Sequence, residues 1–198
     1  MRKVNPIKHD EKRQEILEVA ESCFTRGGFQ GTSIAQICAA ANISPGHLYH
    51  YFESKEAIID AIVDKGLQRA TCHFEAMILG PNALDAITAQ IDIIKSQPQH
   101  AGSILVLDML AEAGRNPALA RIVQKQSKNI CCLLADLLRR GQANGQIEKA
   151  LDADVAANLM LCLIDGTKGL PIRNPKTDRG KCLDQLKVML RLFLAPSQ

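Results

Sequence analysis

The chain has 198 residues, of which 46% are hydrophobic and 23% charged, and its formal net charge is +3. These proportions are close to those of average soluble proteins and exclude a disordered or a fibrous chain. No apolar run reaches the roughly 18 residues that a membrane-spanning helix needs, and the first residues lack the apolar stretch of a signal peptide. We therefore expect a cytoplasmic protein without a membrane partner, built as one helical domain or as a small module joined to a larger one.

Seven cysteines are spread along the chain without a C-x-x-C pair, and most of them lie inside apolar helical patterns. This usage is typical of reduced thiols that are buried as small hydrophobic side chains. A zinc site needs clustered ligands, and the adjacent Cys131 and Cys132 point in different directions on a helix. We expect no metal site and no cofactor, while the sequence leaves open whether any thiol is redox-active.

The region from Ser22 to Phe52 contains no aspartate or glutamate, although it contains Arg26, His47 and His50. A surface that approaches DNA phosphates excludes carboxylates, since each would face a dense row of like charge. An apolar stretch that lacks acids by chance would give the same pattern, so both interpretations stay open. The first thirteen residues hold five lysine or arginine residues, of which Arg2, Lys3 and Lys8 form either a minor-groove arm or a solvated tail; we favour the tail.

Apolar residues recur at intervals of three and four throughout, and alternating strand patterns are missing. This periodicity predicts an all-α fold of about nine helices, with a three-helix N-terminal module followed by a larger helical domain. The first helix should run from about Glu11 to Arg26. Gly27 and Gly28 then end it, because glycine readily adopts the left-handed conformation that closes a helix.

A short second helix follows the two glycines. Either Thr32 or Ser33 supplies its N-cap oxygen, and Gln36 would complete a capping box with Ser33. Its apolar residues recur at helical spacing as far as Ala41, which predicts a helix with one buried face.

A third short helix follows the turn at Asn42 and Ile43. Ser44 can cap it, and Pro45 fits its first position because the amide there needs no hydrogen-bond partner. This helix should reach about Tyr51.

Ser54 is expected to cap a long fourth helix, which a break at residues 80–81 ends. The later helices are expected at residues 82–96, 100–114, 117–143, 152–169 and 181–194. The loop at residues 169–180 is long and basic and should be exposed.

Three helices close together, with a tight turn between the second and the third, describe a helix-turn-helix, whose last helix enters the major groove of DNA. Leu48 and Phe52 fall on one face of that helix and should anchor it to the core. The side chains left to meet DNA are those of Pro45, Gly46, His47, Tyr49, His50 and Tyr51. The alternative that Tyr49 and Tyr51 are core aromatics stays open.

Residues 28–37 (GFQGTSIAQI) and 41–56 (ANISPGHLYHYFESKE) resemble the DNA-binding signature of the TetR family over its full length. The resemblance implies a helix-turn-helix domain at 1–54 and a ligand-binding and dimerisation domain at 55–198. It also implies a homodimeric regulator of transcription, by analogy a repressor, that binds a palindromic DNA operator and is released by a small-molecule effector.

Particular contacts also follow from the resemblance. The residues implied to bind phosphate are Thr32, Ser33, Tyr49, Tyr51 and Lys55, and those implied to face bases are Pro45, Gly46 and His47; Ser44 and His50 complete the expected DNA-contacting set. Tyr51 stands where the family often has histidine, so it keeps a hydrogen-bonding group that cannot carry a positive charge.

In the predicted helix 152–169, residues 155–164 are apolar nearly all round, so this segment must be covered on more than one side. The last predicted helix carries a further apolar stripe. The resemblance implies that these helices form a four-helix bundle between two subunits. The expected interface residues are Val155, Leu159, Leu163, Leu183, Leu186, Leu190 and Phe193. A core within one chain is the alternative.

An effector would bind among the middle helices, within residues 55–145, and would shift the fourth helix, as the resemblance implies. The candidate pocket residues are Phe74, Met77, Leu105, Asp108, Met109, Glu112 and Leu134. Because this region has few aromatic residues, we expect a lipophilic, aliphatic effector. The same apolar residues would equally form an ordinary core. For Asp108, Glu112 and Arg115, the alternative is a solvated stripe of ion pairs on one helix face.

Catalytic motifs are missing from the sequence: it has no nucleophile elbow, no phosphate-binding glycine loop and no zinc-hydrolase motif. We therefore expect no enzyme. The competing function is a DNA-organising protein of the same fold that needs no effector.

Overall fold

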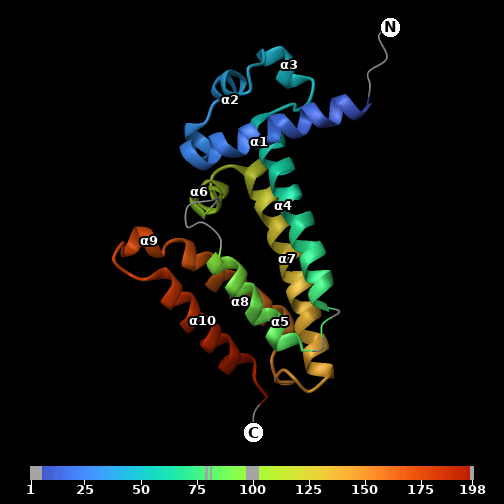
Figure 1. Ribbon diagram of the computed structural model, residues 1–198, viewed down its shortest axis with the longest axis vertical. Coiled ribbons are helices and arrows are strands. Elements are labelled where there is room, and N and C mark those ends of the chain that lie inside the picture. Colours follow the sequence, from blue (N-terminus) through green and yellow to red (C-terminus); the bar gives the residue numbers. More distant parts are fainter. Residues whose placement is uncertain (1–5, 79, 81, 97–102, 197–198) are drawn as a thin grey trace. The chain divides into compact units, whose positions relative to one another are not determined.

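The computed structural model describes residues 6–78, 80, 82–96 and 103–196, with the backbone alone at residues 70, 73–78 and 103. Throughout these residues the regular elements are helices, so the all-α prediction is confirmed (Figure 1). In chain order they are α1 (Pro6–Gly31), α2 (Ile34–Ala40), α3 (Pro45–Tyr49), α4 (Lys55–Ile78), α5 (Ala83–Ser96), α6 (Ser103–Ala113), α7 (Pro117–Ala143), α8 (Ala153–Lys168), α9 (Leu170–Arg173) and α10 (Arg179–Leu194).

Several boundaries differ from the sequence prediction. Helix α1 ends at Gly31 instead of Arg26, and α3 ends at Tyr49 instead of Tyr51. Helix α1 begins at Pro6 instead of Glu11. The loop predicted at 169–180 contains the one-turn helix α9, in which the amide of Arg173 donates to the carbonyl of Gly169 at 3.0 Å. The predicted break at residues 80–81 falls partly outside the described residues.

The predicted helix signals are found where they were expected. Gly28 interrupts the regular helix with φ 70° and ψ 173°, a conformation that favours glycine. Of the two candidate caps for α2, Ser33 is the one used: its hydroxyl accepts from the amide of Gln36 at 3.2 Å, and the side chain of Gln36 accepts from the amide of Ser33 at 2.7 Å. Ser44 caps α3: its hydroxyl accepts from the amide of His47 at 3.2 Å.

The chain divides into two compact units, each packed mainly within itself. Unit 1 comprises the described residues of 1–66 and 104–123, and unit 2 those of 67–103 and 124–198. Helices α4 and α7 therefore each contribute to both units. The functional division predicted at residues 54 and 55 stays a prediction, whereas α6 packs as part of the unit that holds the helix-turn-helix.

The core of unit 1 joins α1 to the helices that follow it. Phe24 and Phe29 stack at 5.9 Å between ring centroids, and both are buried together with Ile37 of α2. Leu48 of α3 and Phe52 are also buried, which confirms them as the anchors of the third helix.

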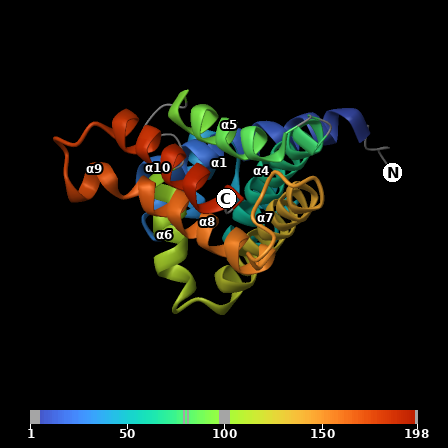
Figure 2. The ribbon, with the colours of Figure 1, turned by 90° about the horizontal axis from the view of Figure 1, so that it is seen from below.

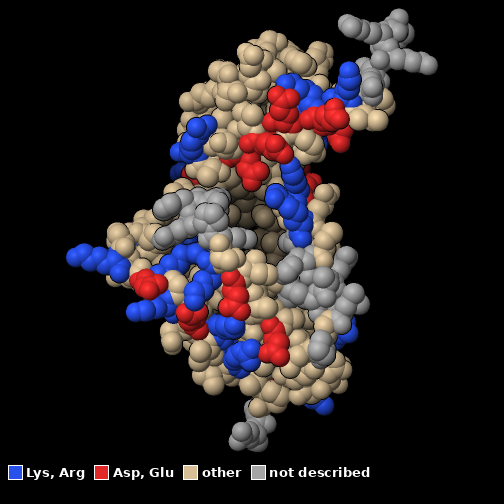
Figure 3. All heavy atoms as spheres, in the orientation of Figure 1, with Lys and Arg blue, Asp and Glu red and all other residues tan. Residues whose placement is uncertain are grey.

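Unit 2 is built around α10, which packs against both α5 and α8 (Figures 1 and 2). Its buried side chains include Leu183, Leu186, Leu190 and Leu194 of α10. Ion pairs join α5 to α10: Lys95 to Asp184 at 2.7 Å, Asp92 to Lys187 at 2.6 Å and Asp85 to Arg191 at 2.7 Å. Charges of both signs therefore alternate on this part of the surface (Figure 3).

The prediction that most of the cysteines are buried was wrong. Only Cys38 and Cys131 are buried, whereas Cys72, Cys132 and Cys162 are exposed. Cys162, for example, lies beside Leu163 of α8, which is exposed as well, so an apolar stretch of sequence does not place these thiols in a core. In the described part of the chain, no three histidine, cysteine, aspartate or glutamate side chains form a possible metal site. None of the helices there is both long and apolar enough to cross a membrane.

Gly141 of α7 occupies a place in unit 2 that has no room for a side chain. A Cβ there would lie 2.5 Å from Cδ1 of the buried Ile147 and 3.0 Å from Cβ of Ala83. Overpacking a core costs about 1–3 kcal/mol, so Gly141→Ala should lower the free energy of unfolding by that amount. Urea denaturation followed by circular dichroism, at one protein concentration, measures the change.

The matched control is Gly66→Ala in α4, where a Cβ would meet no atom within 4 Å. Alanine is the better helix former by up to about 1 kcal/mol, so this variant should be as stable as the wild type or more so. Equal stability of the two variants would contradict the tight packing at Gly141.

Candidate nucleic-acid interface

Helix α3 presents most of its side chains to solvent. It has a single turn, and Leu48 fixes its inner face. Ser44, Pro45, Gly46, His47 and His50 are exposed, and a Cβ at Gly46 would meet nothing within 4 Å. The structure thus leaves this surface open, as a helix that enters a DNA groove requires.

The two tyrosines of this region differ in their surroundings. Tyr49 is 52% exposed, so the alternative of a core aromatic is wrong for it. Tyr51 is half-buried, packs against the core of unit 1 and stacks on His9 of α1 at 4.6 Å between ring centroids. The ring of His47 is a second neighbour, at 5.6 Å. Tyr51 therefore ties α3 to the N-terminal part of α1.

The prediction that Thr32 binds phosphate needs correction. Only 2% of Thr32 is exposed, and its hydroxyl donates to the carbonyl of Cys23 at 3.1 Å. This hydroxyl closes the turn between α1 and α2 and is turned away from solvent. The neighbouring Ser33 is exposed at the N-terminus of α2, so it keeps the position that phosphate binding requires.

Lys55 is also engaged within the protein. Its ammonium donates to the carbonyl of Phe29 at 2.8 Å and to that of Thr32 at 3.2 Å, and it lies 4.3 Å from the centre of the Phe29 ring. An ammonium has three donors, so a single one is left for a phosphate. In this structure, Lys55 therefore mainly holds the end of α1 and the residue that follows it.

The surface over α2 and α3 has almost no charged side chains (Figure 3). Arg26 is the only lysine or arginine between Ser22 and Phe52, and it is exposed. Its Nε donates to the carbonyl of Ser22 at 3.3 Å, which leaves the terminal guanidinium nitrogens toward solvent. Phosphates would therefore meet hydroxyls, backbone amides and few cations on this surface.

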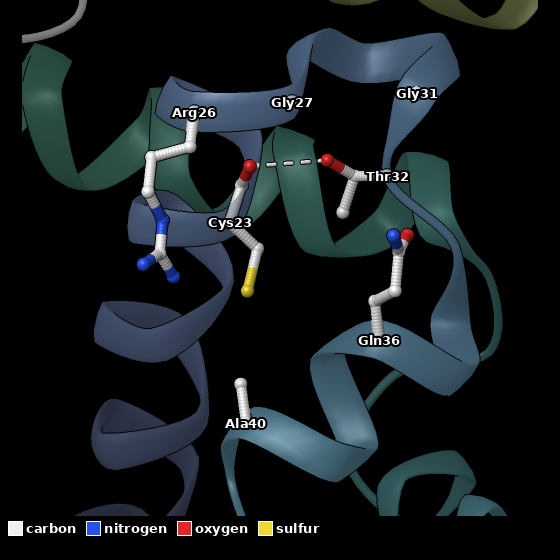
Figure 4. A pocket seen from close by; sticks show the side chains of 7 residues that line it. All are labelled: Cys23, Arg26, Gly27, Gly31, Thr32, Gln36 and Ala40. Carbon is white, nitrogen blue, oxygen red and sulfur yellow. Dashed lines mark hydrogen bonds between the residues drawn. The ribbon is translucent and has the colours of Figure 1, made fainter.

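A cavity of about 330 Å³ lies between α1 and α2. Its lining residues are Cys23, Arg26, Gly27, Gly31, Thr32, Gln36 and Ala40. Figure 4 shows the thiol of Cys23 and the side chain of Gln36 pointing into this space from opposite helices. The cavity lies within unit 1, next to the start of α2, and none of the residues predicted for an effector pocket lines it.

The apolar residues predicted to line an effector pocket lie in the cores of the two units where their side chains are described. Leu105 and Met109 are buried in the core of unit 1, and Leu134 is buried in that of unit 2. These three belong to the ordinary core that the sequence left as the alternative. The side chains of Phe74 and Met77 lie outside the described residues.

Asp108 and Glu112 do not form the solvated stripe that was the alternative for them. Asp108 Oδ2 accepts from the amide of Phe29 at 2.5 Å. Glu112 is 4% exposed and accepts from the side-chain amide of Gln30 and, at 2.7 Å, from Nε of Arg115. The Arg115 hydrogen bond, and then that of Gln30, hold the pKa of Glu112 below its ordinary value. Helical spacing could not reveal these contacts, because their partners lie some 80 positions earlier in the chain.

The expected interface residues fall into two groups. On α8, Val155, Leu159 and Leu163 are exposed, Leu159 at 50%. On α10, Leu183, Leu186 and Leu190 are buried in the core of unit 2, so their prediction as interface residues was wrong. Phe193 is exposed, together with three residues that the prediction missed: Val188, Met189 and Leu192. Helix α10 is apolar on two faces, and this doubled pattern is the sequence signal for them.

Comparisons with known proteins cover both halves of the chain. Residues 16–62 match the family described as bacterial regulatory proteins, tetR family, and residues 84–186 match BetI-type transcriptional repressor, C-terminal. The HTH-type transcriptional regulator UidR of Escherichia coli K12 is 32% identical over 154 residues, 78% of each chain.

Solved structures agree with these matches. The structure of Salmonella enterica GusR has a TM-score of 0.79 and 31% identity and covers 93% of this chain and 95% of its own. That of FadR from Bacillus subtilis, in complex with stearoyl-CoA, has a TM-score of 0.76 at 20% identity, covers 91% and 98%, and supports the fold alone. The chain belongs to the TetR family of transcriptional regulators.

Proposed function

We propose that the chain is a homodimeric repressor that binds a palindromic operator and is released from it by a small-molecule effector. The observation that carries this proposal is the exposed, acid-free surface of α3, which two buried side chains fix to the core of unit 1. The match of residues 84–186 to a repressor C-terminal region supports the direction of regulation. The relatives are transcriptional regulators, and we propose no enzymatic activity.

The contacts with DNA divide by position. Pro45, Gly46 and His47 lie at the start of α3, the end of a recognition helix that meets base edges, so we assign base readout to them. Ser33 and Tyr49 are exposed hydroxyls beside that end, and we assign phosphate contacts to them. The remaining donor of Lys55 and the hydroxyl of Tyr51 complete the set.

A second copy of the chain is the proposed occupant of the exposed apolar faces of α8 and α10. Leu159 is 50% exposed on α8 and Leu192 is 76% exposed on α10, and both lie within stretches of exposed apolar side chains. Burial of such surface stabilises a complex by about 25 cal/mol per Å². A two-fold pairing would present two copies of α3 about 34 Å apart, to successive turns of an inverted repeat.

The proposal of a small-molecule effector rests on the family to which the chain belongs. The FadR structure holds stearoyl-CoA, but at 20% identity its ligand does not define the ligand of this chain. A lipophilic effector stays a prediction, since Leu105, Met109 and Leu134 proved to be core residues. An effector releases DNA only if it binds the DNA-incompetent arrangement more tightly than the competent one.

The general test is recovery of genomic fragments with the purified protein. A few promoter fragments that share an inverted repeat would support a repressor with its own operator. Many dispersed fragments would support the competing function, a DNA-organising protein, and would overturn the proposal. Release of the recovered fragment can then be screened against acyl-CoA thioesters and other small metabolites, with thermal shift as a first indication of binding.

His47→Ala should reduce discrimination between the operator and a scrambled duplex. A side chain that reads a base edge contributes about 1–3 kcal/mol to that difference. The matched control is Tyr49→Phe, which removes only a hydroxyl that we assign to phosphate and should weaken both duplexes alike. Fluorescence anisotropy with both duplexes measures the two affinities. Equal losses on both duplexes for His47→Ala would remove His47 from base readout.

Leu159→Glu should convert the dimer into monomers, because each subunit would bury an unpaired carboxylate in the proposed interface at a cost of several kcal/mol. Analytical ultracentrifugation measures the mass in solution. Leu110→Glu is the control: Leu110 is an exposed apolar residue of α6 in unit 1, 41% exposed, and this variant should stay dimeric. A Leu159→Glu dimer as stable as the wild type would place the interface elsewhere.

A further inference from the structure

Residues 28–32, which we call the joint, follow the regular part of α1 and lead into α2. The joint begins with the left-handed Gly28 and ends at Thr32, whose hydroxyl is bound to the carbonyl of Cys23. Ser33, the cap of α2, comes immediately after it. The direction in which α2 leaves α1 therefore depends on the conformation of these residues.

Two carboxylates of α6 hold the joint from one side. Asp108 accepts from the backbone amide of Phe29 at 2.5 Å, and Glu112 accepts from the side-chain amide of Gln30. A Cβ on Gly28 would lie 3.0 Å from Oδ2 of Asp108, so the glycine also makes room for that carboxylate. Because Glu112 is almost fully buried, its charge depends on Gln30 and Arg115 as partners.

Lys55 of α4 holds the other polar atoms of the same residues. Its ammonium binds the carbonyl oxygens of Phe29 and Thr32. The amide of Phe29 thus donates to the carboxylate of Asp108, and its carbonyl accepts from the ammonium of Lys55. Charge-assisted hydrogen bonds of this kind are about twice as strong as neutral ones, and they fix the orientation of the peptides on both sides of Phe29.

We propose that Asp108 and Glu112 are positioning residues for operator binding, through which the place of α6 sets the orientation of α2 and α3. Neither carboxylate would touch DNA. Both hold the joint so that Ser33 and α3 meet the duplex together. This inference rests on the proposed function, because it names residues that position the same DNA-binding surface.

The sign of the charge makes the inference testable. An aspartate that acted on DNA only through its electric field would repel phosphates, and its removal would strengthen binding. An aspartate that positions the joint has the opposite effect, and its removal weakens binding. Asp108→Ala therefore separates the two roles by the direction of the change.

The experiment measures anisotropy of a labelled duplex that carries the genomic fragment recovered with the wild-type protein. Asp108→Ala should weaken binding about tenfold or more, since it leaves a buried amide without an acceptor. Asp108→Asn keeps a carbonyl oxygen for the amide of Phe29 and should restore the affinity to within about threefold. The slope of affinity against salt should stay that of the wild type in both, because no phosphate contact is removed.

The control variant is Asp184→Ala, which removes an equal charge and the ion pair with Lys95 in unit 2. It should leave operator affinity within about twofold of the wild type, as expected for an exposed pair. Gly28→Ala gives an independent route to the same loss, since its Cβ would crowd Asp108 in a strained backbone conformation. Circular dichroism and sedimentation confirm that each variant is folded and in the oligomeric state of the wild type.

Hydrogen exchange of the amides at residues 28–32 provides the second measurement. The amide of Phe29 should exchange faster in Asp108→Ala than in the wild type and be protected again in Asp108→Asn. Unchanged exchange, or unchanged or tighter operator binding by Asp108→Ala, would overturn the positioning role. Failure of the wild type to recover any DNA would instead refute the proposed function, and the exchange experiment would still decide whether the carboxylates hold the joint.

Discussion

The DNA-binding surface depends on the burial of two side chains. Helix α3 has five residues, and a helix that short is not stable alone in water. It forms because Leu48 and Phe52 are buried in the core of unit 1 and because the hydroxyl of Ser44 caps its first turn. His47 and Tyr49, on either side of Leu48, do not pack in this core, so they are exposed on a rigid support.

The near absence of charge on this surface has a consequence for recognition. Nonspecific DNA affinity comes mainly from lysine and arginine contacts with phosphates. Unit 1 offers Arg26 beside α2, while Lys55 is bound to backbone carbonyls. In the proposed complex, contacts from Ser33, Tyr49 and backbone amides at helix N-termini would take the place of such cations. A surface of this kind gains less from any duplex and relies more on the fit to one sequence.

Local signals in the sequence predicted the helix-turn-helix well, because each depends on neighbours within a few residues. The capping box of Ser33 and Gln36 and the interruption at Gly28 are of this type. The choice between the two apolar faces of α10 depends on distant residues. Leu186 and Leu192 have the same chemistry, and the packing of α5 and α8 against α10 decides which of them is buried. Sequence periodicity also could not reveal the partners of Lys55, which are the carbonyls of Phe29 and Thr32 in the joint.

Three ionic side chains of unit 1 that were expected to bind DNA or a ligand instead position the backbone next to α2. The sequence assigned Lys55 to DNA and Asp108 and Glu112 to a ligand, yet all three bind residues of the joint. Glu112 is buried and Lys55 and Asp108 are half-buried, so each of these charges needs its hydrogen-bond partners. Because Phe29 is held by α4 through its carbonyl and by α6 through its amide, a displacement of either helix strains the same residue. In the proposed complex neither of these helices contacts a base, yet both hold the residues that lead into α2.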